Sequence, residues 1–276
     1  MKTMKPKSLH ISKSLALPTS FVTSTHAILG KKRTGKSYKS DVIAEELLEA
    51  GQQIVILDPT SAHWGLRSSA SGKRAGYPIT IFGGEHGDLP LDPMAGEAIA
   101  DAIVTEHFSA ILDISLMTKG EEQRFCGAFL ERLYRKNKRA MHLFLDEADI
   151  YAPQKPFGDE ARTLGACQSI VLRGGIRGIG ITMITQRPAR LNKDVLSQID
   201  ALTCLGMNHP RDLDAIDEWV SVHGDPNMAK QLRAELPSLP KGDAFIWWPA
   251  KDVFQRVTFR NRTTFDSGRT PEPGDK

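Results

Sequence analysis

The fold of this chain is decided by the stretch Gly30-Lys31-Lys32-Arg33-Thr34-Gly35-Lys36-Ser37. It matches in full the pattern G-x-x-x-x-G-K-[ST] of a phosphate-binding loop, the Walker A motif. The mostly apolar residues 26–29 before it predict a buried strand. Residues 36–50 after it follow a helical period that ends at Gly51, with Ile43, Leu47 and Ala50 on one face and Glu45, Glu46 and Glu49 mostly on the other, solvent-facing side. A loop between a strand and a helix N-terminus surrounds phosphate groups with backbone N–H groups. The sequence therefore predicts a nucleotide phosphate site.

The side chains of this loop have separate predicted roles. Lys36 is expected to reach the β- and γ-phosphates, and the Ser37 hydroxyl is expected to bind Mg²⁺. Residues 31–33 are basic where small residues are common, and we expect an exposed loop, with phosphate attraction or contact with a neighbouring subunit as alternatives. The predicted nucleotide-binding residues are Gly30, Lys31, Lys32, Arg33, Thr34, Gly35, Lys36, Ser37 and Tyr38.

A second motif supplies the carboxylates that such a loop needs. The apolar residues 141–145 predict a strand that ends in Asp146-Glu147, a Walker B pattern. We expect Asp146 to hold Mg²⁺ and Glu147 to polarise the attacking water. An acid directly after the metal-binding Asp favours ATP hydrolysis over a GTPase switch, because such switches usually orient their water with other residues.

Three further polar residues end predicted strands. Gln186 follows the strand 181–185 and is expected to sense the γ-phosphate or contact the catalytic water. Asp58 and Asp113 also follow strands. Asp58 either joins the Mg²⁺ shell or belongs to a plain turn, and the same two interpretations stay open for Asp113.

Strands and helices alternate through most of the sequence. The predicted strands cover residues 26–29, 54–57, 79–82, 110–113, 141–145, 181–185 and 201–205, and the predicted helices cover 36–50, 95–108, 121–139 and 159–172. This alternation predicts an α/β fold with a mostly parallel sheet and helices on both faces. Residues 245–248 and 253–259 predict an antiparallel strand pair that closes the sheet, with Trp247 and Trp248 in the core.

Composition narrows the class of protein. The 276 residues include 36 Lys+Arg and 33 Asp+Glu, a net charge of +3, and 40% are hydrophobic. This is globular composition and does not by itself indicate a nucleic-acid partner. The three cysteines form no C-x-x-C pair, which argues against a zinc ribbon or a disulfide framework and predicts the reducing cytoplasm. No apolar run reaches membrane-spanning length, and the scattered histidines predict no metal site beyond Mg²⁺.

Three segments divide the chain. Residues 1–20 form a basic N-terminal segment whose lysines either touch phosphates or belong to a solvated terminus. Residues 21–262 form the nucleotide-binding domain. Residues 263–276, rich in Pro, Gly and charge from Ser267, are expected to be a flexible tail.

Taken together, these motifs resemble the HerA/FtsK superfamily of ring-forming, DNA-translocating P-loop ATPases. The matching motifs occur in the family's order: residues 30–37, Ile56-Leu57-Asp58-Pro59, Leu145-Asp146-Glu147-Ala148, Thr185-Gln186-Arg187-Pro188 and Leu196-Ser197-Gln198. The resemblance covers residues 20–260 and implies a RecA-like core, a homohexameric ring, ATP bound between subunits and an arginine finger from the neighbouring subunit. Arg173 and Arg177 are the finger candidates, and Gly175 stands where relatives often place an arginine.

Larger HerA proteins carry an N-terminal β-barrel, so the chain resembles a minimal motor domain that works with a separate nuclease or phage packaging component. The first hypothesis is Mg²⁺-dependent ATP hydrolysis coupled to translocation of double-stranded DNA. The second is an ATP-binding ring scaffold with little motor activity, which Gly175 and the missing barrel favour. A monomeric P-loop kinase conflicts with Asp146-Glu147 and with the arginines before the Gln186 strand.

Overall fold

A nine-stranded sheet forms the centre of the computed structural model, which describes residues 8–223 and 225–269. Its order is β11-β10-β9-β3-β8-β7-β4-β6-β5, and the strands from β9 to β5 are parallel while β10 and β11 are antiparallel. The strands are β3 (Thr25–Leu29), β4 (Gln53–Asp58), β5 (Thr80–Gly83), β6 (Ala110–Asp113), β7 (Met141–Leu145), β8 (Ile179–Thr185), β9 (Ala201–Cys204), β10 (Asp243–Trp248) and β11 (Val253–Thr258). The predicted α/β class and the closing antiparallel pair are therefore confirmed.

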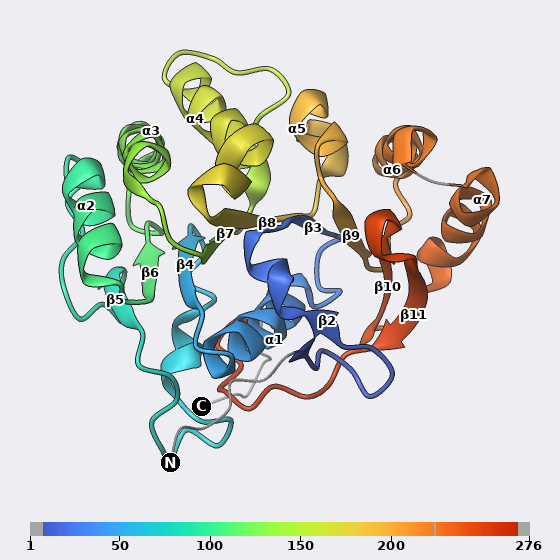
Figure 1. Ribbon diagram of the computed structural model, residues 1–276, viewed down its shortest axis with the longest axis horizontal. Coiled ribbons are helices and arrows are strands. Elements are labelled where there is room, and N and C mark those ends of the chain that lie inside the picture. Colours follow the sequence, from blue (N-terminus) through green and yellow to red (C-terminus); the bar gives the residue numbers. More distant parts are fainter. Residues whose placement is uncertain (1–7, 224, 270–276) are drawn as a thin grey trace.

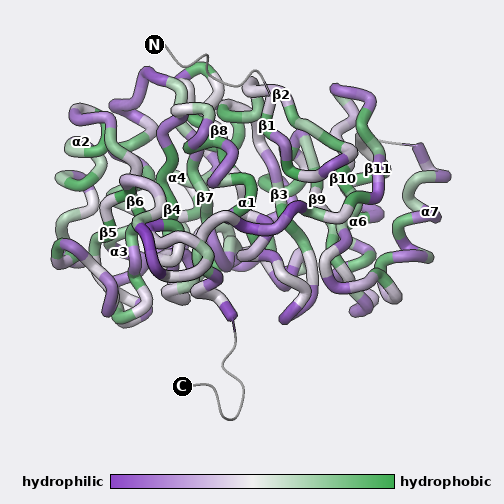
Figure 2. Tube along the Cα trace, turned by 90° about the horizontal axis from the view of Figure 1, so that it is seen from below, coloured by the Kyte–Doolittle hydropathy of each residue, from purple (hydrophilic) through white to green (hydrophobic). Residues whose placement is uncertain are grey.

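Helices cover the two faces of this sheet unequally (Figure 1). The helices are α1 (Lys36–Glu49), α2 (Gly96–Glu106), α3 (Lys119–Lys136), α4 (Glu160–Arg173), α5 (Lys193–Ser197), α6 (Pro210–His223) and α7 (Pro226–Glu235). Helices α2 to α7 lie on one face, whereas α1 lies on the other with the short strands β1 (Ser8–Leu9) and β2 (Leu17–Pro18) and the segment after β11 (Figure 1). Figure 2 shows α2 and α7 at opposite ends of the long axis, with the strands between them.

Each face of the sheet has its own apolar core. In β3, Ala27 and Leu29 face the cluster beneath α2 to α7, while Ile28 faces the cluster around α1. This alternation within a continuous apolar strand follows from the two-residue period of strands and from burial on both sides. Trp247 and Trp248 are buried in these two clusters, as predicted.

Residues near both ends of the described chain are buried against the domain. Leu9, Ile11 and Leu17 are buried in the α1-side core. Thr264, which follows β11, is buried as well. Of the basic N-terminal lysines, Lys13 is exposed, and those at positions 2, 5 and 7 lie outside the described residues.

Helix α1 buries an acid that its sequence pattern placed on the solvent side. Glu45 has no exposed surface and accepts hydrogen bonds from the backbone N–H groups of Thr263 and Thr264, both at 2.9 Å. Its other carboxylate oxygen lies 2.6 Å from Arg260 Nη1. The expectation failed because the segment after β11 crosses α1 and covers that face.

Candidate nucleotide-binding site

The phosphate loop lies at the carboxyl edge of the parallel strands, between β3 and α1. Its backbone is fixed at two points, because Gly30 donates to Thr185 O at 3.4 Å and Lys31 donates to Gly206 O at 3.0 Å. A Cβ at Gly30 would lie 2.8 Å from Leu205 Cβ, so this position requires glycine. Gly35 precedes α1 with φ of 89°, in the left-handed region.

The N-terminus of α1 differs from that of α3. Thr118 and Glu121 cap α3 reciprocally, whereas no side chain caps α1. The first N–H groups of a helix have no partner within the helix, and an anion is their natural ligand. The exposed side chains of Lys31, Lys32 and Arg33 surround this end, as the exposed-loop interpretation expects.

Lys36 is buried at the start of α1, and its Nζ donates to Lys31 O at 3.3 Å. Burial lowers the pKa of Lys36, and the charges of Glu147 and Asp146 partly offset that effect. Tyr38, two residues further along α1, contacts Arg262 with its side chain. Its hydroxyl accepts a hydrogen bond from Arg262 N at 2.9 Å, and the Arg262 guanidinium lies 5.7 Å from the ring centroid.

Asp146 and Glu147 follow β7, two strands from the loop. Asp146 Oδ1 accepts from Glu147 N at 3.0 Å, and Asp146 Oδ2 accepts from Thr60 Oγ1 at 3.2 Å. Burial acts to raise the pKa of Asp146, but His63 outweighs it and holds the pKa below its usual value. Ser37 and Asp146 offer the oxygen ligands that Mg²⁺ prefers, so these side chains fit the ion chemically.

Glu147 has a backbone φ of 49°, which is uncommon for a residue with a side chain. Its carboxylate accepts a hydrogen bond from Gln186 Nε2 at 2.9 Å. Burial raises the pKa of Glu147, and Asp146 raises it further. The ends of β7 and β8 therefore bring together the predicted water-polarising acid and the predicted γ-phosphate sensor.

Comparison with known proteins agrees with this arrangement. No protein-family model matches the chain. The chain is 33% identical over 104 residues, 38% of its length, to the DNA double-strand break repair helicase HerA of Pyrococcus furiosus, and the match covers 17% of that relative. The solved bacterial conjugative coupling protein TrwB matches 98% of this chain and 92% of its own at a TM-score of 0.63 and 12% identity. This chain shares the fold of that solved structure.

A second solved structure shares this fold. The genome packaging NTPase B204 of Sulfolobus turreted icosahedral virus 2, in complex with ATP-gammaS, has a TM-score of 0.54 at 16% identity and covers 86% of this chain and 97% of its own. The likeness at such low identity shows a shared fold. The chain spans less than a fifth of the length of the HerA relative, so activities of that whole protein are proposals for this one.

The two finger candidates lie at the other edge of the sheet. Arg173 ends α4, and Arg177 lies two residues before β8, whose opposite end lies beside the phosphate loop. The seven residues of β8 span roughly 20 Å. Both guanidinium groups lie over Tyr134, at 5.9 and 5.5 Å from its ring centroid. Neither arginine is placed to contact a nucleotide on its own loop.

One histidine lies beside the predicted metal-binding acid. His63 follows β4 and is fully buried, and its Nε2 lies 3.5 Å from Asp146 Oδ2. Burial acts to lower the pKa of His63, but Asp41 and Asp58 outweigh it and hold the pKa well above its ordinary value. The sequence carried two signals for this group, the strand-ending acids Asp58 and Asp146. His63 and Asp41 were missed because α1 and the loop after β4 bring them together only in the fold.

Asp58 and Asp113 are both held by the loops that follow their strands. Thr60 N donates to Asp58 at 3.0 Å, and Ser61 Oγ donates to Asp113 at 2.6 Å. Burial raises the pKa of Asp58. Asp58 therefore organises a turn, and it also lies beside Asp146, with possible ligand atoms within 4.8 Å of one another.

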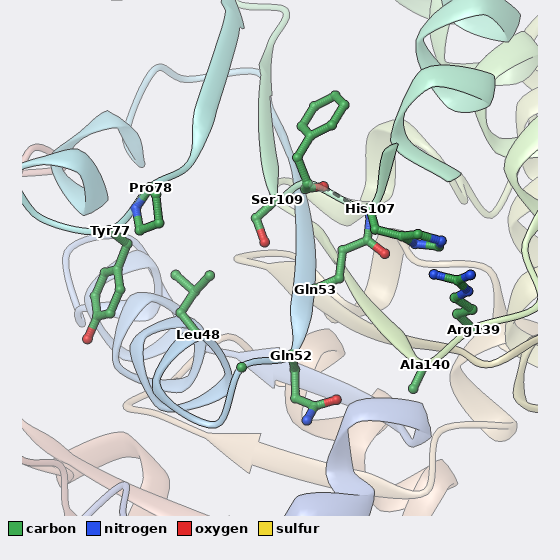
Figure 3. A pocket seen from close by; sticks show the side chains of 11 residues that line it. Leu48, Gln52, Gln53, Tyr77, Pro78, His107, Ser109, Arg139 and Ala140 are labelled. Carbon is green, nitrogen blue, oxygen red and sulfur yellow. Dashed lines mark hydrogen bonds between the residues drawn. The ribbon is translucent and has the colours of Figure 1, made fainter. Parts of the chain in front are cut away.

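A surface pocket lies away from this site (Figure 3). It is lined by residues at the amino ends of strands, among them Gln53, Ser109 and Ala140, whereas the phosphate loop lies at the carboxyl ends. The pocket is therefore separate from the candidate site. No helix in the described parts of the chain is both long and apolar enough to cross a membrane.

Proposed function

We propose that this chain binds and hydrolyses ATP with Mg²⁺ and couples hydrolysis to movement along double-stranded DNA as a homohexameric ring. The observation that carries the proposal is the hydrogen bond from Gln186 to Glu147 beside Asp146, at the sheet edge that also holds the phosphate loop. This arrangement supplies an anion site, a metal-binding acid and an oriented base at one edge.

Each group has a physical role in this proposal. Lys36 and the N–H groups of α1 bind and orient the phosphates. Ser37 and Asp146 hold Mg²⁺, which offsets charge on the phosphate oxygens when bound. Glu147 accepts a proton from the attacking water, and its raised pKa suits a general base near neutral pH. Gln186 orients the Glu147 carboxylate through the hydrogen bond at 2.9 Å.

The ring proposal rests on the position of the arginines. Because Arg173 and Arg177 lie at the edge opposite their own phosphate loop, either one acts as a finger only on a neighbouring subunit. A guanidinium from a neighbour would stabilise charge on the transferring phosphoryl group and make hydrolysis depend on assembly. Similarity to a DNA double-strand break repair helicase and to a genome packaging NTPase supports DNA as the partner.

Two substitutions test the site. Lys36→Ala is expected to abolish nucleotide binding, because it removes the cation that faces the phosphates. Glu147→Gln is expected to keep nucleotide binding and lose hydrolysis, because an amide cannot accept the proton. Binding of a fluorescent ATP analogue and phosphate release by both variants check this, and wild-type turnover in both would contradict the site assignment.

A scaffold that organises a partner nuclease or a phage packaging component is the second candidate. It is favoured by Gly175, which has only Thr23 O near a Cβ, at 4.0 Å, and so leaves room for the arginine that relatives often carry. The mass of the particle with and without ATP and DNA separates the two. A nucleotide-independent ring with negligible turnover supports the scaffold, and DNA-stimulated turnover supports the motor.

A further inference from the structure

A buried group of metal-ligating side chains lies beneath the candidate site. Asp58, His63 and Asp146 each direct a possible ligand atom to one place, and these atoms lie within 4.8 Å of one another. Asp58 and His63 have no exposed surface, and Asp146 is 4% exposed. They come from the end of β4, the loop that follows it and the end of β7, so the fold rather than local sequence assembles them.

The imidazole of His63 is oriented as a metal ligand. Its Nδ1 donates to Asp41 Oδ1 at 2.5 Å, which leaves Nε2 to face Asp146. Within the described chain this buried Nε2 has no hydrogen-bond partner. Ligating histidines typically donate their second ring N–H to a carboxylate, which fixes the tautomer and the ring plane. Asp41 Oδ2 in turn lies 2.6 Å from Arg262 Nη1, and this ion pair fixes the carboxylate that orients His63.

The charges of the group also favour a cation. Among the described residues Asp146 pairs with His63, and no lysine or arginine forms an ion pair with Asp58 or Asp146, so a bound cation would take the place of a proton on His63 Nε2. Buried carboxylates are stable when they are paired or when they coordinate a metal. Asp146 Oδ2 and His63 Nε2 are 3.5 Å apart, and an ion about 2.1 Å from each fits between them.

We propose that Asp58, His63 and Asp146 form a binding site for a divalent first-row transition ion such as Mn²⁺, with Asp41 as the residue that orients His63. An imidazole ligand favours such ions over Mg²⁺, which prefers a shell of oxygen ligands. The ion ties the loop after β4 to the end of β7 and fixes the Asp146 carboxylate. The site shares Asp146 with the proposed ATP site but requires no nucleotide.

The test uses the full chain and Mn²⁺ alone, without nucleotide. Electron paramagnetic resonance of free Mn²⁺ measures the affinity and the number of ions bound, and electron spin-echo modulation detects a ¹⁴N nucleus from a ligating imidazole. We expect one bound Mn²⁺ per chain with imidazole ¹⁴N modulation. His63→Gln removes the modulation and weakens binding at least ten-fold. His86→Gln is the matched control, because exposed His86 stacks on Trp64, 4.0 Å between ring centroids, outside the group.

Three results would overturn the proposal: no Mn²⁺ binding, bound Mn²⁺ without ¹⁴N modulation, or modulation that persists in folded His63→Gln. If His63→Gln does not fold, Asp58→Asn is expected to weaken Mn²⁺ binding at least ten-fold, and unchanged affinity would count against the site. Because no nucleotide is present, loss of this site is distinguishable from failure of the ATP proposal, which the Lys36→Ala binding assay tests separately.

Discussion

Two buried histidines predict that the protein loses stability in mild acid. His142 lies in β7 and His26 in β3, both buried, and Thr182 in β8 separates them. His142 Nδ1 is 3.0 Å from Val22 O, and its Nε2 is 2.7 Å from Thr182 Oγ1. Because a carbonyl only accepts, we assign the proton of neutral His142 to Nδ1, and Thr182 then donates to Nε2.

The same reasoning assigns the tautomer of His26. With its hydrogen committed to His142, Thr182 Oγ1 accepts from His26 Nδ1 at 3.2 Å, and His26 Nε2 accepts from Thr203 Oγ1 at 2.8 Å. Both neutral rings are fully paired, and neither has an acidic partner in this chain of hydrogen bonds. Burial lowers the pKa of His26 to about 3 and that of His142 to about 4.

The magnitude follows from proton linkage. Both folded-state pKa values lie below the ordinary value of 6.5, so the unfolded chain binds these protons first. The two neutral histidines therefore stabilise the folded state fully above pH 6.5, and this stabilisation is lost as the pH falls toward their folded-state pKa values of about 4 and about 3. Between pH 7.5 and pH 5, each histidine costs about 2 kcal/mol, and the pair costs about 4 kcal/mol, a large share of typical domain stability.

Urea unfolding at constant ionic strength, followed by tryptophan fluorescence at pH 7.5, 6.5 and 5.0, measures this loss. The variant His142→Gln is expected to remove about half of the pH-dependent change in unfolding free energy, whatever its stability at neutral pH. His86→Gln, on the exposed ring, is the control and should follow wild type. Equal pH dependence in wild type and His142→Gln would refute the assignment of these two rings.

Four further substitutions test other parts of the account. Glu45→Gln breaks the buried ion pair with Arg260 and is expected to lower the free energy of unfolding in urea by about 3 kcal/mol. The control Glu106→Gln, at an exposed position, is expected to lower it by about 0.5 kcal/mol or less, and equal losses in the two variants would contradict the role of the pair. Gly30→Ala places a Cβ 2.8 Å from Leu205 Cβ and is expected to weaken ATP-analogue binding about ten-fold or more in a fluorescence titration; unchanged affinity would show that the loop tolerates a side chain. Arg173→Ala or Arg177→Ala, whichever removes the finger, is expected to lower kcat about 10³-fold with nucleotide affinity retained, and full turnover in both would exclude them.

The local sequence pattern was sufficient to predict most of the fold. The apolar runs that became β3, β7 and β8 are buried on both faces, so continuous hydrophobicity located them. The strong signal of residues 30–37 placed the start of α1 at Lys36. Asp146 and Gln186 were found for the same reason, because they directly follow strands whose carboxyl ends meet at one edge.

The remaining features depend on contacts between distant residues. Glu45 was placed toward solvent because nothing in its own helix shows that residues 263 and 264 will cover it. Tyr38 follows the loop in sequence, yet Arg262 draws its hydroxyl away. His63 carries no ligand spacing, and its role arises only when Asp41 on α1 and Asp146 after β7 lie on either side of it. Periodicity and motif spacing do not contain such information.

Displacement of a third strand from a DNA triplex tests the central claim most directly, because it reports movement along duplex DNA rather than ATP turnover alone. The account predicts ATP-dependent displacement by wild type, none by Glu147→Gln, and a rate that falls steeply with salt as phosphate contacts are screened. ATP hydrolysis without displacement, and without stimulation by duplex DNA, would contradict it.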